Sequence, residues 1–107
     1  MCTLIKKSWG YERIVYNELY CVKELVYTKA ISSSLHYHDL KHETFYVVSG
    51  AFSVEIMGLT LRMTRGDSVV LPPKSPHRVR CLKPGTILES STHDDPNDCV
   101  RLVPSEV

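Results

Sequence analysis

Two segments near the middle of the chain carry side chains that could bind a metal ion. They have the patterns His36-x-His38-x4-Glu43-x6-Gly50 and Gly66-x5-Pro72-x4-His77. Three imidazoles and one carboxylate suit a first-row transition metal and leave one or two coordination positions open for water or substrate. We therefore predict a mononuclear metal site made of His36, His38, Glu43 and His77.

These ligands are expected to lie on β-strands, because polar and apolar residues alternate around them. Successive side chains of a strand point to opposite faces, so His36 and His38 should share one face. By the same alternation, Arg78 and Arg80 should point away from the side on which His77 lies. A strand pattern thus meets the requirement that the ligands of one cation share a common surface.

The elements that position these ligands can be predicted from the rest of the chain. Short runs rich in β-branched and aromatic residues recur along it, and no window shows the apolar spacing of an amphipathic helix. Many short strands without helices predict an all-β protein, an antiparallel sandwich or barrel. We predict strands over 12–16, 21–31, 35–39, 44–49, 52–57, 59–64, 68–71, 76–81 and 86–92, and a short tail over 99–103.

Length and composition limit the class of protein. A chain of 107 residues is expected to form one domain. Its formal net charge of +1 gives no electrostatic reason to expect nucleic acid or a membrane surface as a partner. No apolar stretch approaches the roughly 20 residues of a membrane-spanning helix, and residues 1–10 lack a secretory signal. We therefore expect a cytoplasmic protein.

The four cysteines give little indication of function. Cys2, Cys21, Cys81 and Cys99 lie far apart and form no C-x-x-C pair, which argues against a zinc knuckle or a redox motif. Reduced thiols are expected in the absence of a signal peptide. Cys21 and Cys81 lie in strand-like stretches and are expected to be small buried apolar residues.

The two metal-binding patterns resemble the paired motifs of the cupin superfamily. The first family motif, Gly-x5-His-x-His-x3–4-Glu-x6-Gly, is present from His36 to Gly50, with Ala30 in place of the leading glycine. The second, Gly-x5-Pro-x-Gly-x2-His-x3-Asn, matches except that Lys74 replaces the middle glycine and Cys81 replaces the asparagine. These departures fall at turn and packing positions, and every ligand position matches.

This resemblance implies a double-stranded β-helix, the antiparallel jelly roll of the cupin barrel. It implies a single cupin domain over 1–107 with its core at about 20–92, on which an N-terminal strand and a C-terminal tail pack. A homodimer formed through edge strands is expected. A narrower resemblance is to the type II mannose-6-phosphate isomerase domain, which is found alone or fused to GDP-mannose pyrophosphorylases. It rests on matches within 9–12, 22–25, 43–50, 76–78 and 100–102.

Three functions are consistent with the predicted ligands. As an aldose–ketose isomerase, the protein would bind an open-chain sugar or sugar phosphate at the metal while a nearby base moves a proton. As an iron-dependent dioxygenase, it would bind a small organic substrate and dioxygen together. As a non-catalytic module, it would use the metal only to orient a metabolite such as a carbohydrate. The metal is one divalent ion, and Mn, Fe, Zn, Ni and Co remain open.

Several other residues have two interpretations each. Lys23 lies in an otherwise apolar strand, where a buried ammonium group is costly without a partner. It is the candidate catalytic residue and could contact a phosphate or sugar hydroxyl, or it could extend to solvent. His42 is expected at the surface and not as a fifth ligand. Trp9 and Tyr11 are either lid or dimer-contact aromatics or ordinary packing, and residues 93–95 are expected to form a solvated turn.

Overall fold

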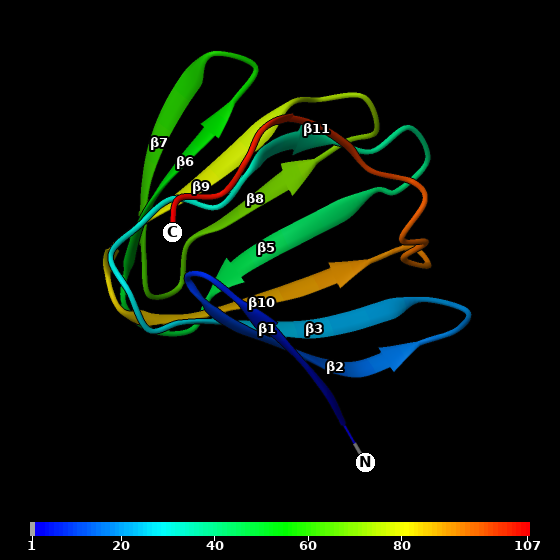
Figure 1. Ribbon diagram of the computed structural model, residues 1–107, viewed down its shortest axis with the longest axis horizontal. Coiled ribbons are helices and arrows are strands. Elements are labelled where there is room, and N and C mark those ends of the chain that lie inside the picture. The colour runs from blue at the N-terminus through cyan, green and yellow to red at the C-terminus, as the bar shows by residue number, and fades with distance from the viewer. Residues whose placement is uncertain (1) are drawn as a thin grey trace.

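The computed structural model describes residues 2–107, and these form two antiparallel β-sheets that face one another (Figure 1). The described part of the chain contains no helix with the length and apolar character that crossing a lipid bilayer requires. The strands are β1 (Thr3–Lys7), β2 (Gly10–Asn17), β3 (Cys21–Tyr27), β4 (Leu35–Tyr37), β5 (Glu43–Val47), β6 (Ala51–Ile56), β7 (Leu59–Thr64), β8 (Ser68–Leu71), β9 (His77–Lys83), β10 (Gly85–Ser91) and β11 (Val100–Val103).

The strand order is that of a jelly roll. One sheet has the order β1-β2-β3-β10-β5-β8, and the other has the order β11-β4-β9-β6-β7. Strands that are distant in sequence therefore pair, as in the ladder between β3 and β10 and the pairing of β4 with β9. The predicted all-β, antiparallel jelly roll is confirmed. The sequence pattern predicts no strand over Thr3–Lys7, yet β1 forms there as an edge strand, whose largely exposed side chains give no apolar alternation.

The inward-facing side chains change character along the barrel. In each of β3, β5, β9 and β10, the side chains at alternate positions point inward. Near one end of the barrel the inward side chain is polar, and toward the other end the inward side chains are apolar. The polar inward residues are Lys23, Glu43, His77 and Glu89. The apolar inward residues that form the closed end include Leu25, Tyr27, Phe45, Val47, Val79, Cys81 and Ile87. One end of the barrel is thus a packed core and the other is a polar chamber.

Gly50, the last residue of the first motif, occupies a position that only glycine fits. Its φ of 84° is in the left-handed region, and a Cβ atom there would lie 2.7 Å from the carbonyl oxygen of Lys83 and 2.8 Å from Cα of Gly85. Gly58 has the same φ of 84° but no atom within 4 Å of the added Cβ. Substitutions at the two glycines therefore distinguish the cost of a strained backbone, which both share, from the cost of a steric conflict, which arises only at Gly50.

Replacing Gly50 by alanine is expected to lower the free energy of unfolding by about 3 kcal/mol or more. The matched variant Gly58→Ala should lose only the cost of the left-handed conformation, about 1–2 kcal/mol. Urea denaturation of both variants beside the wild type measures the difference. Equal losses in the two variants would contradict the proposed conflict at Gly50.

Candidate metal site

Three histidines from two neighbouring strands converge at the polar end of the barrel. His36 in β4 is directly opposite His77 in β9, and His38 follows just beyond the end of β4. One ring nitrogen of each of the three lies within 4.8 Å of the others. The ring centroids of His36 and His77 are 4.5 Å apart, and those of His36 and His38 are 5.0 Å apart. This cluster could bind a metal ion, as the spacing predicted.

Each imidazole is oriented by a carbonyl oxygen that accepts a hydrogen bond from its Nδ1 atom. The distances are 3.1 Å from His36 to Ser34, 2.5 Å from His38 to Asp98, and 2.9 Å from His77 to Ser75. An Nδ1–H donor leaves Nε2 with a free lone pair, which is the form that binds a cation. Two of these carbonyls belong to the residue two positions before the histidine, and because every residue has a backbone carbonyl, residue type alone gives no signal for the contact.

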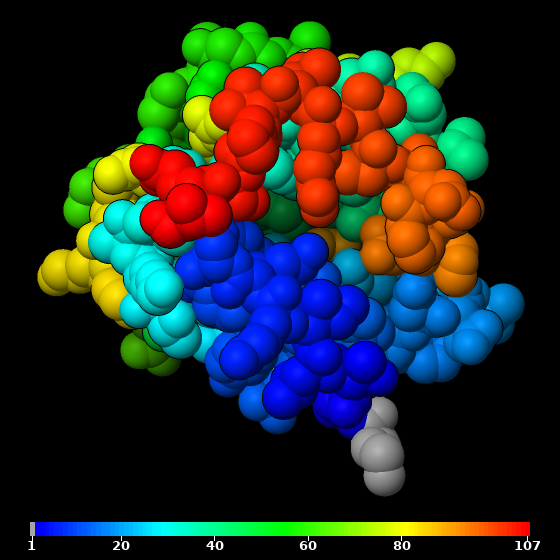
Figure 2. Space-filling view, viewed as in Figure 1, coloured from blue at the N-terminus to red at the C-terminus, as the bar shows by residue number. Residues whose placement is uncertain are grey.

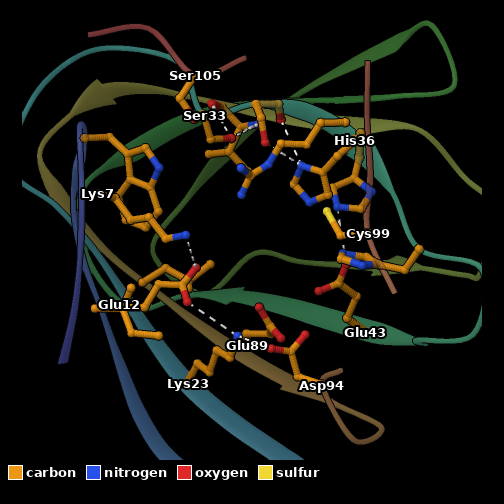
Figure 3. Close-up of a pocket in the computed structure, with 18 of the residues that line it drawn as sticks. Lys7, Glu12, Lys23, Ser33, His36, Glu43, Glu89, Asp94, Cys99 and Ser105 are labelled. Atoms are coloured by element: carbon orange, nitrogen blue, oxygen red, sulfur yellow. Dashed lines mark hydrogen bonds and ion pairs between the residues drawn. The ribbon is translucent and has the colours of Figure 1, made fainter. Parts of the chain in front are cut away.

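Glu43 places a carboxylate oxygen beside the histidines (Figure 3). Its Oε2 atom lies 3.2 Å from Nε2 of His77 and 3.4 Å from Nε2 of His38. Both Glu43 Oε2 and His77 Nε2 are buried, and neither has a hydrogen-bond partner in the described structure. Two lone pairs that face one another without a donor cost free energy unless a cation lies between them. The residues present therefore fit a bound metal ion.

The electrostatic environment keeps these groups in the forms that bind a metal. Burial and the neighbouring rings of His77 and His38 lower the pKa of His36 to about 3, so its imidazole is neutral at neutral pH. Burial alone would raise the pKa of Glu43. The ammonium group of Lys41, 3.2 Å from Oε1, opposes this effect, and the pKa of Glu43 lies below its ordinary value.

The structure reveals a buried lysine that sequence reasoning missed. Lys41 is 4% exposed, and its Nζ atom contacts Glu43 Oε1 at 3.2 Å, Glu89 Oε2 at 3.1 Å and Asp94 Oδ1 at 2.9 Å. Burial raises the pKa of Glu89, and Lys41 opposes this effect only in part. Alternation along β10 could have placed Glu89 inside, because it follows the buried Ile87 by two positions. Lys41 precedes β5 in a loop and gives no such signal.

Lys23 points into the chamber and does not reach solvent. It is 5% exposed, and its Nζ atom lies 2.7 Å from Asp94 Oδ2 and 3.4 Å from Glu12 Oε1. The predicted solvated turn over residues 93–95 is therefore wrong for Asp94, whose carboxylate turns inward to bind Lys23 and Lys41. His93 and Asp95 are exposed, as expected for a turn. The catalytic role of Lys23 stays a prediction.

The pairing of Asp94 predicts a dependence of stability on pH. Burial would raise the pKa of this carboxyl, but Lys41 and Lys23 lower it from 3.8 to about 2. A depressed pKa means that the stabilisation is fully present above pH 3.8 and is lost as the pH falls through about 2.

Asp94→Asn should therefore be less stable than the wild type at neutral pH, and the two free energies of unfolding should converge on acidification. Urea denaturation at stepped pH measures the difference. Asp39→Asn is the matched control, because Asp39 is exposed and lies outside the ion-pair network. A difference that stays constant from neutral pH down to about 2 would contradict the pairing.

Asp98 ties the loop after β10 to the metal site. Its backbone carbonyl orients His38, while its carboxylate accepts hydrogen bonds from the backbone N–H groups of Asp39, Leu40 and Lys41. These bonds span 57 to 60 positions in the sequence. The segment that carries Asp94 and Asp98 thus fixes both a candidate ligand and the buried lysine.

The chamber is a cavity of about 550 Å³, within the range of roughly 300–1,000 Å³ that is typical of small-molecule sites. The three histidines, Glu43 and the ion pairs form its polar wall. Its mouth opens between the blue N-terminal residues and the orange-to-red C-terminal segment (Figure 2). Trp9 lines the cavity but is 4% exposed and stacks on Tyr27 at a centroid distance of 4.1 Å, so it is a packing residue.

The remaining candidate residues lie outside the cavity. His42 is exposed, as expected, and takes no part in the histidine cluster. Arg78 and Arg80 face away from the metal site, and Arg80 pairs with Glu106 at 3.0 Å. The predicted burial of Cys21 and Cys81 is confirmed, with 0% and 1% exposed.

Comparisons with known proteins agree with this fold. The family described as "Cupin domain" matches residues 24–95. Comparison with curated proteins gives no match. Among solved structures, KdgF from Halomonas sp. is 21% identical over 89% of each chain, with a TM-score of 0.79. An RmlC-like cupin from Shewanella frigidimarina is 21% identical over 90% of this chain and 87% of that one, with a TM-score of 0.80.

A third structure, a variant of Streptomyces PAC13 with uridine, is 12% identical over 98% of this chain and 87% of that one, with a TM-score of 0.80. All three identities are too low to transfer a substrate or a reaction. What these structures have in common with this chain is the fold, and the fold hosts many functions.

Proposed function

Because this chain belongs to the cupin family, we propose that it binds one divalent transition metal and uses it to bind or isomerise a sugar or sugar phosphate. His36, His38 and His77 would supply three nitrogen ligands, and Glu43 would supply a carboxylate oxygen. A divalent cation in such a site acts as a Lewis acid toward carbonyl and hydroxyl oxygens. Which of Mn, Fe, Zn, Ni and Co is bound depends on availability as well as on the ligands.

One observation carries the proposal. The buried atoms Glu43 Oε2 and His77 Nε2 lie 3.2 Å apart, and no donor lies between them. Both residues line a cavity that is large enough for a monosaccharide. The carbonyl oxygens that orient the imidazoles and the Lys41 ammonium that contacts Glu43 Oε1 would hold the ligand set in place before a cation binds. Such preorganisation is what a small-molecule metal site requires.

The chain's own groups suit an isomerisation as well as binding. Such a reaction moves a proton between two adjacent carbons, and a group beside the substrate must accept and return it. Carboxylates of Glu89 and Asp94 line the same cavity as the histidines, within hydrogen-bond distance of the buried Lys41. The finer proposal, from the sequence resemblance, is the type II mannose-6-phosphate isomerase reaction.

The test is conversion of mannose 6-phosphate to fructose 6-phosphate by metal-loaded protein under anaerobic conditions. We expect turnover with the wild type and none after chelation. Substrate-dependent oxygen consumption with iron, and no isomerisation, would favour the dioxygenase alternative. Ligand-dependent thermal stabilisation without turnover would favour the binding module.

A further inference from the structure

The polar wall of the cavity is a continuous chain of ion pairs with alternating sign, and Figure 3 shows its members Glu12, Lys23, Asp94 and Glu43 around the cavity. It begins at the candidate ligand Glu43 and continues through Lys41, Asp94 and Lys23 to Glu12. The longest of these contacts is 3.4 Å, between Lys23 and Glu12. Glu89 branches from Lys41 at 3.1 Å. The wall is therefore already ordered, and a ligand meets hydrogen-bonding groups whose directions are fixed.

The donors of this wall are used within the protein. An ammonium group has three N–H donors. Lys41 donates two of them, to Glu89 Oε2 at 3.1 Å and to Asp94 Oδ1 at 2.9 Å, and its Nζ atom also forms an ion pair with Glu43 Oε1 at 3.2 Å. Lys23 likewise contacts two carboxylates, those of Asp94 and Glu12. Most of the hydrogen-bonding capacity of the two lysines is thus used within the protein, and a phosphate or carboxylate of a ligand would meet more carboxylate oxygens than free N–H groups.

The acceptors of the wall, by contrast, are in surplus. Glu89 is 4% exposed and lines the cavity, and its Oε2 atom accepts from Lys41 and from the hydroxyl of Ser91 at 3.3 Å. No described residue donates a hydrogen bond to its Oε1 atom. A carboxylate oxygen that lines a cavity and has no donor from the protein favours a ligand that supplies one. A cationic donor is disfavoured because a bound divalent metal would repel it within the same cavity.

We propose that Glu89, together with Asp94 and Lys41, forms a hydroxyl-binding wall, and that the part of the ligand held against it is an uncharged polyhydroxyl group. This inference rests on the proposed function, since it specifies which part of a sugar the chamber recognises. A hydroxyl donates to a carboxylate oxygen and can also accept, so adjacent hydroxyls suit a wall of this kind. A phosphorylated sugar would have to place its phosphate outward, toward the mouth.

The test compares neutral sugars with their phosphates on Co²⁺-loaded protein by isothermal titration calorimetry. Mannose and glucose are expected to bind at least as tightly as their 6-phosphates, and inorganic phosphate should not displace them. Glu89→Gln should weaken the binding of the neutral sugar by about tenfold or more, as loss of a hydrogen bond to a charged group does. The matched control is Glu24→Gln, because Glu24 is on the same sheet but half-exposed and paired with Arg13.

The possible outcomes distinguish a failure of the hydroxyl-binding wall from a failure of the proposed function. Binding of a sugar 6-phosphate without binding of the neutral sugar would overturn the hydroxyl-binding wall and leave the proposed function intact. Displacement by inorganic phosphate, or unchanged affinity in Glu89→Gln with normal metal stoichiometry and a normal circular dichroism spectrum, would also overturn it. If neither form of any sugar binds, the proposed function fails, and the inference fails with it.

Discussion

Replacing His77 by alanine is expected to weaken metal binding by more than about 100-fold. Loss of a partner that only orients a ligand already costs about 10–100-fold, and His77 is itself a proposed ligand. Its ring faces both His36 and Glu43, and its Nε2 atom lies 3.2 Å from Glu43 Oε2. Titration with Co²⁺, followed by visible absorption and by metal content after dialysis, measures the effect.

His42→Ala is the matched control for this experiment. The same side chain is removed one position before Glu43, but His42 is exposed and lies outside the histidine cluster. Its affinity for Co²⁺ should equal that of the wild type. If His77→Ala still bound one equivalent of metal with unchanged affinity and spectrum, the proposed site would be wrong.

Replacing Lys41 by methionine should destabilise the protein by about 3–5 kcal/mol, the cost of breaking a buried ion pair by removing one partner. Burial would lower the pKa of Lys41, but Glu89, Glu43 and Asp94 raise it above its ordinary value, so the lysine is charged throughout the neutral range. Without it, Glu43 and Glu89 lose their lysine contact, and Asp94 keeps only Lys23. Chemical denaturation at neutral pH measures the loss.

Lys83→Met is the control for Lys41, because Lys83 is exposed and lies in none of the ion pairs of the described structure. A surface change of this kind should alter the free energy of unfolding by less than about 0.5 kcal/mol. A loss below about 1 kcal/mol in Lys41→Met would show that the three carboxylates do not depend on this lysine.

The sequence predicted those parts of the site that lie on regular strands. The period of two along a strand predicts that His36 and His38 share one face and that Arg78 points away from His77, and the structure agrees, although His38 lies just beyond the end of β4. The same period, applied to β10, would have identified Glu89. The jelly roll was predictable because many short apolar runs without helical spacing admit few other architectures.

The rest of the site could not be predicted because it lies in irregular segments. Lys41 lies between β4 and β5, and Asp94 follows β10 in a stretch without secondary structure. Side-chain direction in such segments depends on the path of the loop, which here is set by distant contacts such as those of Asp98. Asp94 looked like a turn residue because it is surrounded by residues that favour turns. The composition of this segment indicates solvent exposure. Only the tertiary structure reveals that Asp94 binds Lys23 and Lys41.

The hydrogen bonds of Asp98 have a consequence for the order of folding. The carbonyl that orients His38 and the carboxylate that holds the backbone at Lys41 come from a residue 57 to 60 positions later in the chain. Contacts of such long range form late, since closing a large loop costs entropy before the contact repays it. A partly folded chain would orient the rings of His36 and His77 through their local contacts without fixing the ring of His38. Tight metal binding would then be acquired in the final step of folding and would report its completion.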